Sequence, residues 1–324
     1  MIQRTISPKT PSAFGKAGVS DVMISSNWLD HLLGRFGKVL VIGVPMTFLL
    51  LFFASPFLIV LKISLSQMDG IGFKDISTFT DGVWTLQLKL ANFGTVLVED
   101  LYLLAYLSSV KYAAITTVIC LAIGYPFAYF LARSRPEIRP ALLMLVMLPF
   151  WTSFLLRVYA WKMLLADDGV FNQLFNWLGL QTEPLKMMYT PFSLTLGMVY
   201  TYLPFMVLPL YATLVKMDIR LLEAARDLGA SPWVAFWKVT VPLSMNGIIA
   251  GALLVFIPCV GEFVIPELLG GPQTLMIGRV LWDEFFSNND WPLASSVAIA
   301  MILLIIVPMA IFSKYQAENE GSRK

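Results

Sequence analysis

Residues 221–233 read LLEAARDLGASPW, a polar segment with clear boundaries inside a chain that is 57% hydrophobic and only 14% charged. The sequence here holds the signals for two short helices joined by a turn. Asp218 precedes the first helix as an N-cap, and Gly229 stands where a left-handed residue commonly ends a helix. Ser231 and Pro232 then supply an N-cap and a proline at the first helical position of the second.

The two helices together predict a stiff helix–turn–helix elbow. The first helix is expected from Ile219 to Leu228, and the second is expected to end at Pro242, because proline interrupts the backbone hydrogen bonds of a helix. Two roles are open for this elbow. It either covers the cytoplasmic end of the helical bundle or forms a docking surface for a soluble partner. The first helix should carry its apolar residues on one side: Leu221, Leu222, Ala225 and Leu228.

The rest of the 324 residues decides where this elbow lies. A soluble domain of this length could not bury so much apolar surface in one core. Runs of about 20 apolar residues are long enough to cross a bilayer, and in lipid they must be helices. The sequence therefore predicts an all-α membrane protein with six transmembrane helices, at about 39–61, 108–132, 141–164, 191–215, 243–266 and 292–313.

Basic residues set the orientation. Most of the 23 Lys and Arg residues fall in four places: the N-terminal segment, residues 133–139, the loop 216–242 and the C-terminal tail. Cytoplasmic loops are enriched in Lys and Arg, so both termini and the elbow are expected in the cytoplasm of a multi-pass inner-membrane protein.

This orientation divides the chain into three parts. Residues 1–38 are expected as a cytoplasmic segment with frayed residues 1–25 and an interfacial amphipathic helix at 28–36. Residues 39–313 form the transmembrane domain, and 314–324 form a cytoplasmic tail. His31, the only histidine, fits a plain interfacial residue better than a pH sensor.

No motif indicates an enzyme. The chain lacks a phosphate-binding glycine loop, an HExxH zinc motif and a Gly-x-Ser-x-Gly nucleophile elbow. Cys120 and Cys259 lie within spans, so neither a disulfide framework nor a metal site is expected. We expect no catalytic residue, no bound metal or cofactor and no nucleic-acid partner.

The elbow resembles the EAA loop of ABC importer permeases, in Glu223, Ala224 and Ala225, then Asp227 and Gly229, and finally Pro242. The resemblance implies that the first helix of the loop seats in a cleft of a cytoplasmic ATPase. In the family a Leu-Pro pair ends the motif, and here Val241 replaces that leucine.

The resemblance extends from about residue 40 to 313. LPFWTSFLLRVYAW (148–161), YLPFMVLPLY (202–211), GEFVIPELLGGP (261–272) and IGRVLW (277–282) are similar to the polyamine branch of these permeases, most of all its putrescine type. The resemblance implies a type I ABC importer permease (MetI-like) fold and no enzymatic activity in this chain. It also implies a homologous second permease, two copies of an ATPase that uses ATP and Mg, and a periplasmic polyamine-binding protein.

A diamine pathway needs carboxylates and aromatic faces, since these replace the water around an ammonium group. Glu262 lies near the outer end of the fifth span and Glu267 just beyond it. An acidic side chain within a span should face a cavity or a partner. Glu262 therefore contacts substrate or forms a structural ion pair with Arg279 or Arg157, and the sequence leaves both alternatives open.

Three aromatic residues of the third span, Phe150, Trp151 and Tyr159, are candidates for an aromatic path or gate, although packing and interfacial anchoring are commoner roles. Arg157 and Lys162 would repel a polyamine in that path, so they are expected to extend to the outer surface.

The outer loops are expected to differ from the inner ones. They carry an excess of acidic residues, including Glu284, which could steer cations inward or form an ordinary solvated surface. Residues 273–286 are expected to form one amphipathic helix with Trp282 and Phe285 facing inward.

Three functions remain after these observations. The sequence favours a permease subunit of an ATP-driven polyamine importer, with putrescine as the preferred substrate and spermidine or another cationic amine as the alternative. A secondary transporter is a rival, but it would usually show inverted repeats and buried carboxylates near the midplane. A purely structural scaffold would leave the elbow unexplained.

Overall fold

The computed structural model describes residues 26–70, 72–74, 76–80, 83–86, 88–181 and 183–321. The expected frayed segment 1–25, the last residues of the tail and the outer acids Asp75 and Asp81 lie outside these ranges. The chain divides into two compact units, Met1–Val60 and Leu61–Lys324.

The first unit is helical throughout its described part. Helix α2 (Ser26–Leu49) continues through a π-helical turn, η1 (Leu50–Ala54), into α3 (Ser55–Ser64). The interfacial stretch 28–36 and the first expected span thus belong to one uninterrupted helix. Its apolar portion, Val39–Ser64, is long enough to cross a bilayer, and no residue of its most apolar window is buried within the chain.

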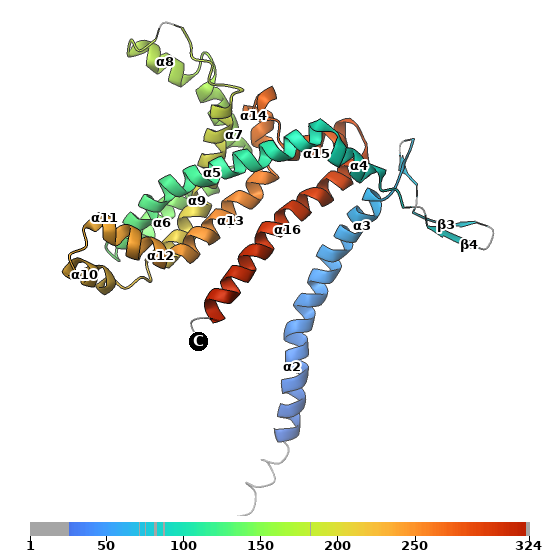
Figure 1. The fold of residues 1–324 in the computed structure, drawn as a ribbon, viewed down its shortest axis with the longest axis horizontal. Helices are drawn as coiled ribbons and strands as arrows, with labels where there is room; N and C mark the ends of the chain where they lie inside the picture. The colour runs from blue at the N-terminus through green and yellow to red at the C-terminus, as the bar shows by residue number, and fades with distance from the viewer. Residues whose placement is uncertain are drawn as a thin grey trace, which may run out of the picture. The chain divides into compact units, whose positions relative to one another are not determined.

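The second unit is built around three helices that pack side by side (Figure 1): α5 (Asp100–Arg133), α9 (Pro191–Leu214) and α13 (Met245–Val260). Small residues let these helices approach closely, as is common where apolar helices meet in membranes. A Cβ on Gly251 of α13 would lie 2.8 Å from the Met206 sulfur of α9. Met206 itself is fully buried in the largest apolar core of the unit.

Two of the expected spans are broken rather than continuous. The third consists of α6 (Arg139–Met147), η2 (Leu148–Trp151), α7 (Phe154–Leu165) and the short outer helix α8 (Val170–Trp177), with a bend of 85° after Trp151. Thr152 and Ser153, the residues at the break, have extended ψ angles of 150° and 135°.

The fifth expected span also differs from the prediction. A run of α11 (Pro232–Ala235), the π-helical turn η3 (Phe236–Thr240) and α12 (Val241–Leu243) meets α13 at a bend of 67°. The helical run ends at Leu243, one residue beyond Pro242, which agrees with the predicted end of the second helix. The expected span to residue 266 stops at Val260, and a separate helix, α14 (Val264–Leu269), follows.

The outer segment expected as one helix is divided into η4 (Pro272–Thr274), α15 (Ile277–Trp282) and a π-helical turn, η5 (Asp283–Ser287). Trp282 and Phe285 are each 41% exposed and so do not face a core. Helix α16 (Trp291–Gly321) follows and packs on α4 (Ala91–Val98) and α15.

Two short antiparallel hairpins modify the all-α expectation. Strand β1 (Met68–Asp69) pairs with β2 (Gly72–Phe73), and β3 (Ser77–Thr80) pairs with β4 (Val83–Leu86), with Ser77 opposite Leu86. The Asn92 side-chain amide donates to the carbonyls of Ser64 and Ser66.

By length and composition, three helices in the described ranges can cross a membrane, or five if each bent pair counts as one span. The apolar part of α16, Trp291–Ile306, is shorter than a full span by the same criterion. The count of six spans therefore remains a prediction.

Candidate functional sites at the inner elbow and the outer helix break

The elbow is formed by α10 (Arg220–Asp227) and α11. Asp218 does not occupy the N-cap position itself, which is Ile219, but its carboxylate accepts from the Arg220 N–H at 3.0 Å. Gly229 has a φ of +82°, so it is the left-handed residue that the sequence predicts. Ser231 caps the next helix, because its hydroxyl accepts from the Val234 N–H at 3.3 Å.

The elbow exposes more of its apolar surface than the sequence pattern predicts. Of the four apolar residues expected on one side of α10, only Leu222 is buried, and Leu228 is 89% exposed. Glu223, Ala224 and Asp227 are also exposed. The surface around the EAA segment is therefore largely exposed, while Leu222 packs inward.

The second half of the elbow is tied to the helical core. The Phe236 ring meets the Tyr125 ring of α5 edge to face, with centroids 5.4 Å apart. The Tyr125 hydroxyl forms a buried 2.8 Å hydrogen bond with the hydroxyl of Ser244, the residue between α12 and α13. These two contacts connect the elbow to the residues at the bend in the fifth span.

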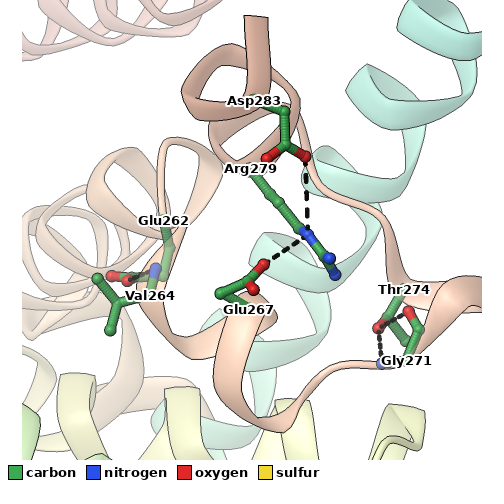
Figure 2. A network of polar contacts seen from close by, with 7 residues as sticks. All are labelled: Glu262, Val264, Glu267, Gly271, Thr274, Arg279 and Asp283. Carbon is green, nitrogen blue, oxygen red and sulfur yellow. Dashed lines mark hydrogen bonds and ion pairs between the residues drawn. The ribbon is translucent and has the colours of Figure 1, made fainter. Parts of the chain in front are cut away.

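Glu262 lies at the opposite end of α13, in the break before α14 (Figure 2). Its carboxylate accepts from the Val264 N–H at 3.1 Å and the Ile265 N–H at 3.4 Å, and from the Tyr202 hydroxyl of α9. A carboxylate in this position satisfies N–H groups that have no partner within the helix. Glu262 is therefore a cap for α14, half-buried and anchored to α9.

The expected ion pair of Glu262 with an arginine is absent from these contacts. Arg279 pairs instead with Glu267 at 2.7 Å, and its Nε lies 4.0 Å from the Asp283 carboxylate (Figure 2). These contacts join α14 to α15 across the Gly270–Thr274 turn. Glu267 is half exposed, so the pair lies at the edge of the break rather than deep in the bundle.

The aromatic candidates separate in space. Phe150 packs edge to face on Phe205 of α9, with centroids 5.0 Å apart, and Phe205 lies 6.1 Å from the Tyr202 ring. Phe150 is thus linked through two rings to Glu262. Trp151 and Tyr159 are 74% and 49% exposed and do not join this cluster.

Arg157 reaches the surface only in part, since the residue is half-exposed. Its guanidinium lies over the rings of Phe150 and Phe154, at 5.5 Å and 5.9 Å from their centroids. Its Nε and one terminal nitrogen are buried and have no hydrogen-bond partner among the described residues.

Glu284 likewise differs from the expected solvated acid. It is only 7% exposed, and it accepts from the Tyr102 hydroxyl at 2.8 Å and the Asn288 amide at 2.9 Å. It therefore adds little to an acidic outer surface. Across the described ranges no three His, Cys, Asp or Glu side chains gather to hold a metal ion, and Cys120 and Cys259 are buried free thiols.

Sequence reasoning missed Tyr202, Phe205 and Tyr102, which position the acidic residues. Each is an aromatic residue within an apolar helix, and its partner lies far away in the sequence. No local pattern distinguishes such a residue from ordinary packing.

Residues 122–318 match the family model described as binding-protein-dependent transport system inner membrane component. The spermidine/putrescine transport system permease protein PotB of Haemophilus influenzae is 39% identical over 90% of this chain and 96% of its own length. Escherichia coli PotB is 41% identical over 74% of this chain and 85% of its own.

A solved structure supports the same fold. A bacterial ABC transporter that imports the acidic polysaccharide alginate aligns with a TM-score of 0.64 and 15% identity, covering 92% of this chain and 99% of that one. A second structure of an alginate transporter, bound to a periplasmic protein carrying an alginate pentasaccharide, aligns with a TM-score of 0.62 and 15% identity, covering 86% of this chain and 93% of that one.

Proposed function

This chain belongs to the family of binding-protein-dependent transport system inner membrane components, and on that premise we propose that it is a permease subunit of a polyamine importer. As an ABC permease subunit it is not an enzyme, and ATP is hydrolysed by a separate subunit. The observation that carries the polyamine proposal is the 39–41% identity to PotB permeases over most of the chain. The names of these relatives include both spermidine and putrescine, so putrescine is the narrower form of the proposal and spermidine the alternative.

The proposed coupling site is the EAA segment of the elbow, with Glu223, Ala224 and Ala225, together with Asp227 and Gly229. The exposed face of α10 supports this role, since a motor subunit needs an accessible surface to bind. The next step of the proposed coupling is that the elbow moves the bend of the fifth span. The ring contact of Phe236 with Tyr125 and the hydrogen bond of Tyr125 with Ser244 support this step. Pro242 lies at the end of that moving part, one residue before the helical run stops at Leu243.

The complete machine proposed here has a second homologous permease, two ATPase copies and a periplasmic polyamine-binding protein. The loaded receptor docks outside, ATP closes the ATPase pair, and the elbow is drawn with it. The two permeases then change from inward- to outward-facing, and hydrolysis resets them. The family assignment argues against the alternative function of a secondary transporter. The capping role of Glu262 does so too, because hydrogen bonds already engage the carboxylate that would have to bind a coupling ion.

The substrate is tested by uptake of labelled putrescine and labelled spermidine in cells that lack other polyamine importers and produce the whole system. We expect saturable uptake of at least one amine, competed by the other and lost when the ATPase is inactivated. A system that hydrolyses ATP in response to its receptor but takes up neither amine would refute the polyamine assignment.

The coupling surface is tested by cross-linking. Cysteine introduced at Ala224 or Ala225 should form cross-links to the ATPase subunit in membranes. Ala224 is exposed and Ala225 is half-exposed, so both positions are accessible. If neither cysteine captures the ATPase, the proposed docking role of α10 is wrong.

A further inference from the structure

The second half of the elbow, the run from α11 through η3 to α12, carries an exposed aromatic surface that the docking role of α10 does not use. Trp233 is 69% exposed and Trp237 is 52% exposed, and their rings meet edge to face with centroids 5.7 Å apart. Val234 and Lys238 are exposed beside them. Exposed apolar side chains that gather in one place commonly mark a contact with a partner or a membrane.

The run has a packed side and an exposed side. Ala235 and Thr240 are buried, and Phe236 is half-buried because its ring packs against the Tyr125 and Tyr129 rings of α5. The two tryptophans are one helical turn apart, so they belong to one stripe of the run. The burial pattern thus separates the residues that hold the run on the bundle from the residues that are open to another surface.

The bend in the fifth span sets the direction of this run. Residues 232–243 meet α13 at 67°, and α13 is part of an expected span. Spans are tilted from the bilayer normal by about 20° on average, so the run lies closer to the plane of the membrane than to its normal. A helix in that direction with one exposed apolar side is typical of the membrane interface. Tryptophan is enriched at this level because its ring is amphipathic.

Composition distinguishes the two halves of the elbow in the same sense. Helix α10, RLLEAARD, holds four charged residues in eight, whereas residues 232–243 hold only Lys238. A lysine beside interfacial aromatic residues can extend its ammonium group to lipid phosphates while its stem covers apolar surface. Exposed apolar residues continue through Leu243 at the bend to Leu254 in α13, where the expected span contacts lipid.

We propose that Trp233 and Trp237 anchor the second half of the elbow in the headgroup layer of the membrane, with Lys238 reaching the lipid phosphates. The inference goes beyond the proposed function, because the partner it names is the lipid surface rather than the ATPase or the substrate. The elbow then has two contact surfaces: α10 for the ATPase and the aromatic run for lipid.

The test uses the complete transporter, reconstituted with its partner subunits into vesicles of phosphatidylethanolamine and phosphatidylglycerol. Trp233→Cys and Trp237→Cys are labelled one at a time with a fluorophore. Cys120 and Cys259 have no exposed surface, so they should not react. Quenching is then compared between a lipid that carries a nitroxide on its headgroup and iodide in the water. We expect the nitroxide lipid to quench both labels strongly and iodide to quench them weakly.

Leu228→Cys is the matched control, because Leu228 is 89% exposed on the same elbow but follows the charged helix α10. The nitroxide lipid should quench this label weakly. If either tryptophan variant fails to assemble, Val234→Cys gives the same comparison from the same exposed side.

Two results would overturn the proposal. Labels at the tryptophan positions that do not respond to the nitroxide lipid would lie in water, if iodide quenches them, or against the ATPase, if neither quencher reaches them. Equal lipid quenching at Leu228→Cys would show that the elbow is not divided into two surfaces.

The measurement is independent of the substrate and coupling proposals, since it requires neither a polyamine nor ATP hydrolysis. Lipid contact at Trp233 and Trp237 together with no capture of an ATPase at Ala224 would support the anchor and reject the coupling site. The reverse combination would reject the anchor alone.

Discussion

Glu262 serves a structural role at a position where the sequence left a substrate contact and a structural ion pair both open. Its carboxylate holds the first turn of α14 and accepts from Tyr202, so the break in the fifth span has a defined geometry. Hydrogen bonds to a charged group contribute about 1.5–3 kcal/mol each when buried, and less when water reaches them. The residue therefore stabilises the outer end of the bundle whether or not an amine approaches it.

Replacing Glu262 by Gln should destabilise the assembled transporter by about 1–3 kcal/mol, because the neutral amide accepts weaker hydrogen bonds from α14. The melting temperature of the purified complex measures this effect. Tyr202→Phe should cause a smaller loss, since the backbone cap remains. The matched control is Glu267→Gln, whose partner Arg279 is at the edge of the break; its stability should change little.

The KM for polyamine separates the two roles of Glu262. A raised KM with unchanged stability would make Glu262 a substrate contact and contradict the capping interpretation. Lowered stability with an unchanged KM for the surviving transporter would support the cap.

At the scale of elements, the elbow was largely predictable because its signals are local. Gly229 and Ser231 act through their own backbone and through neighbours within a few residues, and both behave as the sequence indicates. Pro242 also agrees with the sequence, since the helical run ends one residue after it. The break at Thr152 and Ser153 was missed because hydropathy measures apolar length and carries no information about direction.

Gly229 offers a direct test of the elbow's geometry. A Cβ at this position would meet no atom within 4 Å, so substitution costs only the strain of a left-handed backbone. Gly229→Ala should therefore destabilise the turn by about 1 kcal/mol. We expect the uptake supported by each hydrolysed ATP to fall, because a looser elbow transmits less movement.

Gly229→Asn is the control for this effect, since Asn visits the left-handed region more readily than Ala. It should retain more coupled transport than the alanine variant. Equal ratios of uptake to ATP hydrolysis in the wild type and Gly229→Ala would show that the turn's conformation does not limit coupling.

At the scale of the whole molecule, composition predicts the class and the approximate positions of the helices, whereas the contacts that build the sites depend on residues distant in sequence. Tyr202 and Glu262 are separated by 60 residues, and Tyr102 and Glu284 by 182. No periodicity within one helix specifies such a pair. The same limit applies to Arg157, whose guanidinium lies over the Phe150 ring from across the break between η2 and α7.

Orientation across the membrane is the remaining whole-molecule prediction, and the two native cysteines make it easy to test. Cys120 and Cys259 have no exposed surface, so they should contribute little background to a thiol-labelling experiment. Leu228 follows α10 and is 89% exposed, and Trp177 at the end of α8 is 81% exposed. Helices α10 and α8 lie at different ends of the helical bundle (Figure 1). Each can be replaced by cysteine without removing a buried contact.

In intact spheroplasts a membrane-impermeant thiol reagent should modify Trp177→Cys and leave Leu228→Cys unmodified, because the basic loop 216–242 is expected inside. After permeabilisation both variants should react, which shows that the introduced thiols are accessible. Labelling of Leu228→Cys in sealed cells would reverse the assigned orientation. It would also place the elbow outside the cytoplasm, the compartment in which ATP is available, and would therefore contradict the proposed docking of the ATPase.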